Sequence, residues 1–138
     1  ARIRGHSVIG NHTRVGNFVE FKACILHDEA KAAHLSYLGD VDIGEKTNIG
    51  CGTIVANYDG YNKTKTFIGK DVFVGSGSTL ISPIVVEDNA FIAAGSTINR
   101  SVPKDDMAIA RARQENKPGY GIVVRERALQ KKLASQKK

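Results

Sequence analysis

The stretch IGKDVFVGSGSTLISPIVVEDNAFIAAGSTI, residues 68–98, places an aliphatic residue at every sixth position. An amphipathic helix would need apolar residues at i, i+3, i+4 and i+7, which the stretch from Ile68 to Val102 does not supply. A period of six indicates instead a solenoid in which each hexad forms one flat side of a triangular prism. The hexad residues are Ile68, Val74, Leu80, Val86, Ile92 and Ile98 and, upstream, Ile3, Ile9, Val15, Phe21, Ile43 and Ile49.

The positions between the hexad residues fit the same prism. A small or β-branched residue stands four places after most hexad residues, which suits a second, smaller inward position near a corner. Glycine often follows a hexad residue directly, and we expect it to let the backbone turn there with positive φ. Three hexads close a coil, so residues eighteen apart should stack at about 4.8 Å. The sequence therefore predicts an all-β fold, a hexapeptide-repeat parallel β-helix.

Composition limits the remaining possibilities. A chain of 138 residues with 41% hydrophobic content suits one domain built round a solenoid core. No run of about 18 apolar residues and no apolar leader is present, so we predict neither a membrane span nor a signal peptide. Cys24 and Cys51 fall within hexads, which favours small buried residues in a reducing cytoplasm over a disulfide. Because the repeat is already under way at Ala1, we expect an upstream part to be missing.

The net charge of +6 is concentrated near the C-terminus. Such a charge attracts nucleic acid, anionic membranes or polyanionic small molecules. No aromatic residues are interleaved with the basic ones to stack bases, so we expect no nucleic-acid partner. The basic segment is expected to be a solvated, partly disordered tail, with Arg125, Arg127, Lys131, Lys132, Lys137 and Lys138.

Two interruptions break the period, and functional loops of solenoids occupy such positions. The first is HDEAKAAHLS, residues 27–36, which brings His34 close to Tyr37. The second is VANYDGYNKTKTF, residues 55–67, where Asn-Tyr-Asp-Gly favours a turn. We expect two loop insertions, the second of which reaches toward a ligand or a neighbouring chain.

The period stops after Val102, and Pro103 is expected to mark the exit from the prism because proline cannot donate a hydrogen bond to the next coil. We therefore divide the chain into a β-helix, residues 1–102, and a C-terminal extension, residues 103–138. Residues 103–120 form an irregular segment and residues 121–138 the basic tail. Ala128, Leu129 and Leu133 allow a terminal helix there.

Stacking predicts one pair of cations. Arg4 and Lys22 are eighteen residues apart, so they should share a corner on successive coils. Like charges at that spacing repel unless an anion lies between them, and a phosphate would accept both. Two solvated side chains that point apart remain the alternative.

Histidine is the residue that titrates near neutrality without help, which makes His34 the candidate for proton transfer. A zinc site is the competing use of histidine. His6 and His12 are six residues apart and so lie on adjacent faces, while His27 and His34 lie in the first interruption. This spacing gives no trustworthy ligand set.

Several strings resemble the acetyltransferase domain of the bacterial bifunctional N-acetylglucosamine-1-phosphate uridyltransferase/glucosamine-1-phosphate N-acetyltransferase. They are GNFVEFK (16–22), AHLSYLGD (33–40), IGEKTNIGCGTIVANYDGYNKTKTFIG (43–69), DVFVGSGSTL (71–80), IAAGSTI (92–98) and AIARARQ (108–114). The resemblance covers about residues 1–120. It implies a left-handed β-helix that assembles as a homotrimer in the cytoplasm, with the uridyltransferase domain as the missing upstream part.

The resemblance also implies residue roles. His34 would be the general base, and the sugar phosphate would be bound by Arg4 and Lys22. Tyr37, Asn48 and Lys63 would complete the sugar site. The acetyl-CoA side would comprise Cys51, Asn57, Tyr58, Ser76, Ala94 and Arg111, with Cys51 standing where relatives often have alanine.

The implied reaction transfers an acetyl group from acetyl-CoA, a co-substrate, to the 2-amino group of glucosamine 1-phosphate. It needs no metal, and magnesium is expected only for the missing domain. Alternatives are a hexapeptide acyltransferase with another amine or hydroxyl acceptor and a non-enzymatic or zinc-dependent β-helix.

Overall fold

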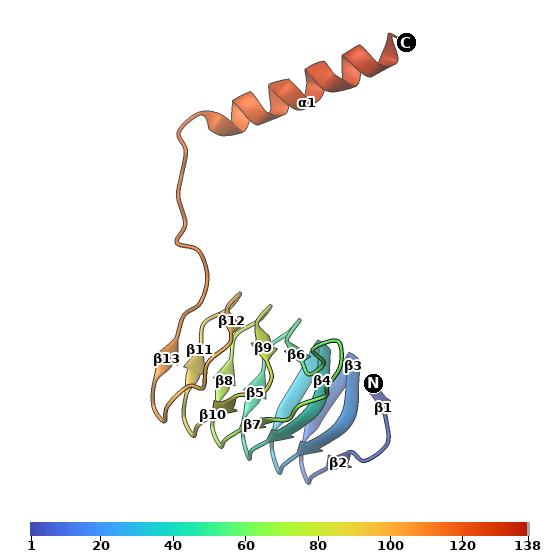
Figure 1. The fold of residues 1–138 in the computed structure, drawn as a ribbon, viewed down its shortest axis with the longest axis vertical. Helices are drawn as coiled ribbons and strands as arrows, with labels where there is room; N and C mark the ends of the chain where they lie inside the picture. The colour runs from blue at the N-terminus through green and yellow to red at the C-terminus, as the bar shows by residue number, and fades with distance from the viewer. Residues whose placement is uncertain (138) are drawn as a thin grey trace.

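The computed structural model describes residues 1–137, which form a parallel β-helix, an extended segment and a C-terminal helix (Figure 1). Lys138, the last residue of the predicted tail, lies outside the described residues. The predicted hexapeptide solenoid is confirmed, with about 6 turns. Its strands are β1 (Arg2–Ile3), β2 (Val8–Ile9), β3 (Arg14–Leu26), β4 (Lys31–Ile43), β5 (Asn48–Ile49), β6 (Ile54–Ala56), β7 (Thr66–Ile68), β8 (Phe73–Val74), β9 (Thr79–Ile81), β10 (Val85–Val86), β11 (Phe91–Ile92), β12 (Thr97–Ile98) and β13 (Met107–Ala108).

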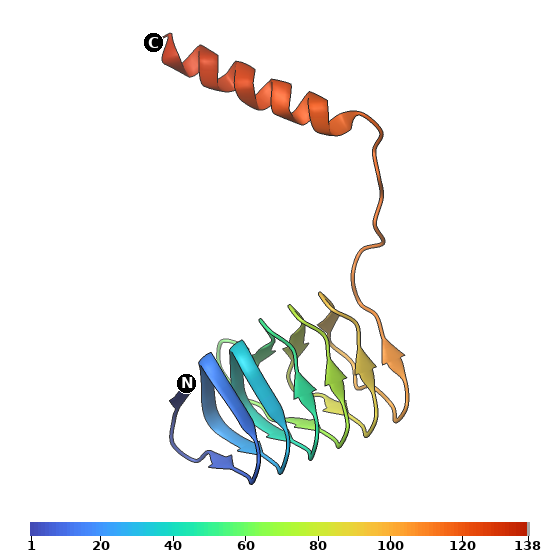
Figure 2. The ribbon, with the colours of Figure 1, turned by 180° about the vertical axis from the view of Figure 1, so that it is seen from behind.

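Parallel pairing sorts the strands into three faces. The first face contains β1, β6, β9 and β12, the second contains β2, β7 and β10, and the third contains β5, β8, β11 and β13. The long strands β3 and β4 run round two corners and contribute to all three faces. Successive coils therefore stack along one axis, as Figure 2 shows from behind.

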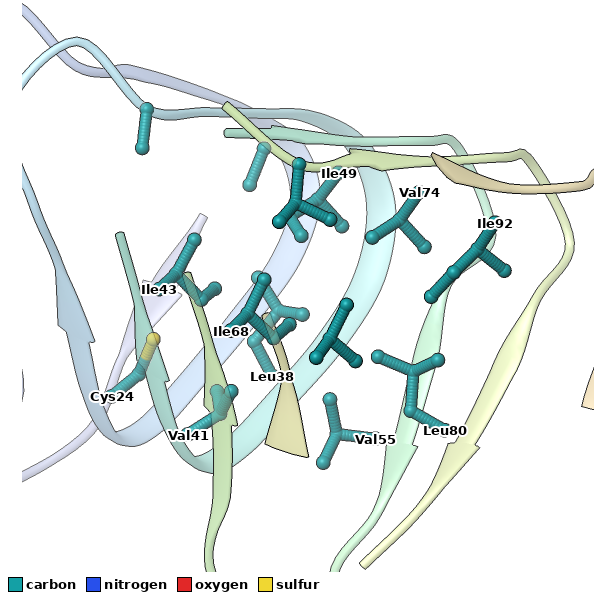
Figure 3. Close-up of a cluster of buried hydrophobic side chains, with 14 of the residues drawn as sticks. Cys24, Leu38, Val41, Ile43, Ile49, Val55, Ile68, Val74, Leu80 and Ile92 are labelled. Carbon is teal, nitrogen blue, oxygen red and sulfur yellow. The ribbon is translucent and has the colours of Figure 1, made fainter. Parts of the chain in front are cut away.

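The interior of the prism is filled by the hexad residues and by the smaller residues between them. Phe21, Leu38 and Ile43 have no exposed surface, and Figure 3 shows how side chains from successive coils meet inside the prism. Cys24 belongs to this core, as expected, and burial together with the charge of Asp42 raises the pKa of its thiol to about 12. The same expectation is wrong for Cys51, which is exposed at a corner. Ile3 is 54% exposed because its coil has a neighbour on one side only.

The first predicted insertion is wrong. Residues 31–43 form strand β4, which pairs with β3 from Arg14↔Lys31 to Leu26↔Ile43, a register of 17 residues. Two one-residue deletions hide the repeat. Between Phe21 and Leu26 the spacing of consecutive inward-facing residues is five positions instead of six. The same short step recurs from Leu38 to Ile43. Leu26, Ala32 and Leu38 are the hexad residues that the period of six missed, and all three are fully buried.

The role expected for the glycines after the hexad residues is also wrong. None of Gly10, Gly16, Gly44, Gly50, Gly69 and Gly75 has a positive φ. A Cβ on Gly16 would lie 1.7 Å from the carbonyl oxygen of Ala33 on the next coil, so the absent side chain permits close stacking. The positive φ occurs at the corners and is often carried by other residues, such as His12, Leu35 and Asp40.

The second predicted insertion is present. The register across it is 25 residues, as in Ile54↔Thr79, whereas the neighbouring coils have 17 or 18. The predicted exit at Pro103 comes too early, since β13 pairs with β11 through Phe91↔Met107 and Ile92↔Ala108. The extended segment then leads to α1 (Tyr120–Gln136), which stands away from the prism (Figure 1) and buries no side chain between residues 120 and 136.

Candidate active site

One edge of the prism carries a row of predicted site residues. The row begins at Asn17, which was not among the predicted residues and pairs with His34, and it continues through the predicted Cys51, Ser76 and Ala94. Backbone bonds join these coils: Gly77 N donates to Cys51 O at 2.7 Å, and Gly95 N donates to Ser76 O at 2.8 Å. The guanidinium of Arg111 donates to Ala94 O and ends the row. We call this row, Asn17, His34, Cys51, Ser76, Ala94 and Arg111, the His34 edge.

The His34 edge lies at a corner because the residue after each member from Asn17 to Ala94 has a positive φ and turns the chain. Leu35 follows His34 with φ 38°, and Gly52, Gly77 and Gly95 follow the next three members with φ between 71° and 76°. His34, Cys51, Ser76 and Ala94 are all exposed. Each of these coils thus presents one exposed side chain at the same place, which forms a continuous border beside the first face.

A second group lies at the opposite border of the first face, where the prism turns toward its second face. Lys22 Nζ donates to Asp40 Oδ2 at 2.8 Å, and Asn57 Nδ2 donates to the same oxygen at 2.7 Å. Asn57 Nδ2 also lies 3.4 Å from Tyr37 Oη. Lys22 and Asp40 keep only 19% and 20% of their side-chain surface exposed. We call Lys22, Tyr37, Asp40 and Asn57 the Asp40 cluster.

Arg4 stands beside this cluster. Register Arg2↔Glu20 and Ile3↔Phe21 places Arg4 next to Lys22 on the neighbouring coil, as the spacing of eighteen predicted. Each cation has a carboxylate partner, because an Arg4 guanidinium nitrogen lies 3.5 Å from Glu20 and Lys22 pairs with Asp40. The repulsion expected between two bare cations is therefore reduced by the protein itself.

The carboxyl of Asp40 stays ionised in this setting. Partial burial opposes its ionisation, but the hydrogen bonds from Lys22 and Asn57 and the charges of Lys22 and Lys63 outweigh it. They hold the pKa of Asp40 below its usual value of 3.8. The charge of Lys63 thus reaches the cluster from the long loop.

The long loop between β6 and β7 is a small hairpin. Tyr58 and Lys63 form an antiparallel bridge, and Thr64 N donates to Asn57 O at 2.9 Å. The turn is closed by Asp59, whose Oδ1 accepts from Tyr61 N at 2.8 Å and from Asn62 N at 2.6 Å. These bonds lower the pKa of Asp59. The residues Tyr58 and Tyr61 are 60% and 94% exposed, so the loop presents aromatic residues to its surroundings.

Asn48 belongs to neither group and lies on the third face, which adjoins the His34 edge but not the Asp40 cluster. It pairs with Lys31 and Phe73 on the third face, whereas Tyr37 pairs with Ile54 on the first. The predicted loop position of His34 is wrong as well, since it lies on β4. Among residues 1–137, no group of three or more histidine, cysteine or acidic residues could hold a metal ion.

Sequence reasoning missed Asp40 and Glu20. Asp40 follows Lys22 by eighteen residues, the same spacing that paired Arg4 with Lys22, so a search of that corner for anions as well as cations would have found it. Glu20 stacks directly on Arg2, also eighteen residues earlier.

Comparison with known proteins agrees with the repeat and the fold. The family described as bacterial transferase hexapeptide (six repeats) matches residues 65–100. The acetyltransferase domain of PglB from Neisseria gonorrhoeae, solved with acetyl coenzyme A, superposes with a TM-score of 0.71 at 17% identity. That match covers 79% of this chain and 51% of the PglB chain. AntD, an N-acyltransferase from Bacillus cereus solved with dTDP and 3-hydroxybutyryl-CoA, gives 0.71 at 19% identity over 96% of this chain and 85% of its own. At these identities the likeness concerns the fold alone.

The fold and its repeat define the chain as a hexapeptide-repeat parallel β-helix protein. Its sequence is 55% identical over 120 residues to the bifunctional protein GlmU of Staphylococcus epidermidis, and equally to that of Bacillus mycoides. Each match covers 87% of this chain and falls on the C-terminal region of GlmU. Over most of its length the chain is therefore homologous to the GlmU proteins, of which it spans about a quarter: 27% and 26% of the two relatives. No helix among the described residues is long and apolar enough to cross a membrane.

Proposed function

We propose that the chain transfers the acetyl group of acetyl-CoA to the 2-amino group of glucosamine 1-phosphate, giving N-acetylglucosamine 1-phosphate. The observation that carries the proposal is that the exposed His34 and the Asp40 cluster with its Lys22 lie on the two borders of the first face. The residues concerned lie in the AHLSYLGD and ANYDG strings that resemble the acetyltransferase domain. We assign the reaction to the bacterial cytoplasm, where acetyl-CoA is available.

The chemistry requires a neutral amine. In the proposed step His34 accepts the proton of the attacking 2-amino group, a new N–C bond forms at the thioester carbonyl, and the C–S bond breaks. The coenzyme A thiolate is a good leaving group, so no covalent enzyme intermediate is needed. Cys24 is buried with a raised thiol pKa, which makes it unsuited to act as a nucleophile.

The Asp40 cluster and Arg4 supply the proposed sugar-phosphate site. A phosphate can accept from the Arg4 fork and the Lys22 ammonium together. Tyr37 would contact the sugar between that phosphate and His34. Asn57, which the resemblance assigned to the acetyl-CoA side, is proposed here to contact the sugar instead, because its amide is bonded within the Asp40 cluster. Lys63 adds positive charge from the long loop.

The His34 edge supplies the proposed acetyl-CoA site. Cys51, Ser76 and Ala94 succeed one another along the prism, so an elongated ligand can lie across successive coils. Arg111, at the far end, is the proposed contact for coenzyme A phosphates, which gives residues 103–120 their role beside the coenzyme. Tyr58 would approach from the loop.

We propose that the working assembly is a homotrimer. Asn48 lies on the third face, where it cannot share a substrate with Tyr37 of the same chain unless the ligand passes round the prism. A neighbouring chain would bring its Asn48 to the site and would cover the exposed loop. The magnesium-dependent uridyltransferase step belongs to the part of the relatives that this chain does not span.

The test is a comparison of His34→Asn with His12→Asn. His12 is an exposed corner histidine on another edge, so the second variant makes the same chemical change away from the site. We expect His34→Asn to lower turnover by about 10² to 10⁴-fold, the usual contribution of a general base, and His12→Asn to leave it unchanged.

Chromatographic detection of N-acetylglucosamine 1-phosphate is the suitable readout, because it is not disturbed by the exposed thiol of Cys51. Acetyl-CoA affinity, measured separately, should be the same in all three proteins. Full turnover in His34→Asn would remove the histidine from the mechanism. Equal rates with unphosphorylated glucosamine would instead favour a different acceptor.

A further inference from the structure

Asp40 makes no proposed contact with either substrate, yet Lys22 and Asn57 of the Asp40 cluster both bond to it. One of its oxygens, Oδ2, accepts both the Lys22 ammonium at 2.8 Å and the Asn57 amide at 2.7 Å. We propose that Asp40 is a positioning residue, which fixes the directions of Lys22 and Asn57 before the sugar phosphate binds. The proposal rests on the proposed acetyl transfer.

The packing around Asp40 indicates a preformed cluster. Gly39, which precedes it, is buried beneath Tyr37 and Asn57: a Cβ there would lie 2.4 Å from Tyr37 Oη and 2.6 Å from Asn57 Nδ2. Asp40 itself has φ 50°, a corner conformation that aspartate and asparagine adopt more readily than most residues. The backbone thus aims the carboxylate at two side chains that come from different coils.

The charge of Asp40 argues against a role in affinity. A carboxylate bonded to Lys22 reduces the positive potential available to an incoming phosphate, so it would weaken binding if it acted through charge alone. Orientation is the benefit that remains. Lysine loses considerable rotamer freedom when it is fixed, and a charge-assisted hydrogen bond imposes that loss before the substrate arrives.

A positioning role predicts a particular kinetic pattern. When the substrate is held in a looser geometry, turnover falls, since small displacements from the reactive arrangement reduce rate steeply. Phosphate binding should not weaken, because the repelling charge has gone. Loss of a merely structural corner would give a different pattern, a lower melting temperature with unchanged turnover in the folded protein.

The experiment compares Asp40→Asn with Asp42→Asn in the whole chain. Asparagine tolerates the corner conformation at position 40, so the variant is expected to fold, which circular dichroism and thermal melting would verify. Asp42 is the matched control: it lies on the same strand and pairs with His27 at 2.8 Å, outside the cluster. Turnover and KM for glucosamine 1-phosphate are measured for both, together with inhibition by inorganic phosphate.

For Asp40→Asn we expect turnover to fall about 10- to 10²-fold, with an equal or lower KM for the phosphorylated sugar and equal or stronger inhibition by inorganic phosphate. Asp42→Asn should match the parent in all three. Turnover of Asp40→Asn within about twofold of the parent, or a raised KM with normal turnover, would overturn the proposal.

A second readout separates this inference from the reaction itself. The Asn57 side-chain amide gives its own NMR signals, and in the parent these should report a single fixed environment. In Asp40→Asn they should shift and broaden toward those of a mobile amide, whereas Asp42→Asn should leave them in place. If the parent makes no product, the proposed function fails and this readout still decides the positioning role. Unchanged Asn57 signals in Asp40→Asn would refute it.

Discussion

Both cations of the proposed phosphate site already form ion pairs within the protein: Arg4 with Glu20 and Lys22 with Asp40. An incoming phosphate must therefore share each cation with a carboxylate. Such sharing costs little at Arg4, which has five donors in a fork and one partner at 3.5 Å. Lys22 has three donors, and one of them is held by Asp40 at 2.8 Å.

We expect Arg4→Ala and Lys22→Ala each to weaken glucosamine 1-phosphate, by roughly tenfold or more, because each removes a charge-assisted contact to one phosphate. The double variant should lose less than the sum of the two. Steady-state KM values for the sugar phosphate and for acetyl-CoA are the measurement, with the acetyl-CoA value unchanged. Arg14→Ala, on the third face, is the control cation.

Unphosphorylated glucosamine completes that test. It should be a poor acceptor for the parent and should lose little further in either variant, since the missing contact was made to the phosphate. If both variants kept the parent's preference for the phosphorylated sugar, the discrimination would have to come from other residues.

At the scale of strands and turns, the spacing between coils depends on glycine at the point of closest approach. Gly16→Ala should destabilise the β-helix by about 3 kcal/mol, because the new Cβ would overlap the backbone of Ala33 and neither of the two paired coils can move aside without breaking hydrogen bonds. Gly5→Ala is the control, since a Cβ there meets nothing within 4 Å and Gly5 has no positive φ.

Chemical denaturation of both alanine variants measures the difference in unfolding free energy. The control should stay within about 0.5 kcal/mol of the parent. A Gly16→Ala variant as stable as the control would mean that the coils can separate locally at no cost.

The turn of the long loop depends on an ionised carboxylate. The pKa of Asp59 is depressed below 3.8 by hydrogen bonds from Asn62 N and Tyr61 N. A depressed pKa means that this support is fully present above pH 3.8 and is lost as the pH falls through the lower folded value. We expect the amide NMR signals of Tyr61 and Asn62 to titrate together in that acidic range and to stay constant at neutral pH.

Asp59→Asn separates charge from geometry in this turn. Asparagine can form the same turn through its neutral oxygen, so the two amides should lose their acidic titration while the loop keeps its shape. Titration of both amides at the same pH in the variant would show that another group controls the loop.

The hexapeptide pattern predicted the strands wherever the spacing was regular, from Ile68 to Ile98. It failed at Leu26, Ala32 and Leu38, because two one-residue deletions shift the phase and an alanine is a weak hexad signal. A strand that runs round corners, as β4 does, cannot be distinguished from a polar loop by period alone. Strand β13 was missed for a similar reason. It follows Pro103, and its register to β11 is 16 residues instead of the expected 18.

For the whole molecule, the sequence predicted which residues stack on successive coils only where their spacing equals a full coil of eighteen, and the membership of the site stays a prediction. Stacking placed Arg4 beside Lys22 because their spacing is a full coil. It missed Asn57, because the register that pairs Tyr37 with Ile54 and stacks Asn57 on Asp40 is 17 residues, one short of the expected coil, and it did not reveal that Asn48 would face another side of the prism. Those relations depend on the three-dimensional course of the coils.

The position of Asn48 leads to a prediction about assembly. If each active site takes His34 from one chain and Asn48 from its neighbour, a mixture of His34→Asn and Asn48→Ala chains, unfolded together and reassembled, should recover activity that neither variant has alone. Random mixing in equal amounts gives about a quarter of the parent's activity, because a quarter of the interfaces in a cyclic trimer pair an intact histidine with an intact asparagine.

Reassembly of each variant by itself is the control, and sedimentation should report a trimer in every sample. A mixture that stays as inactive as its two components would place both residues in the same chain's site. In that case one chain would have to bring its first and third faces to one substrate, and the long loop would need a covering partner for some other reason.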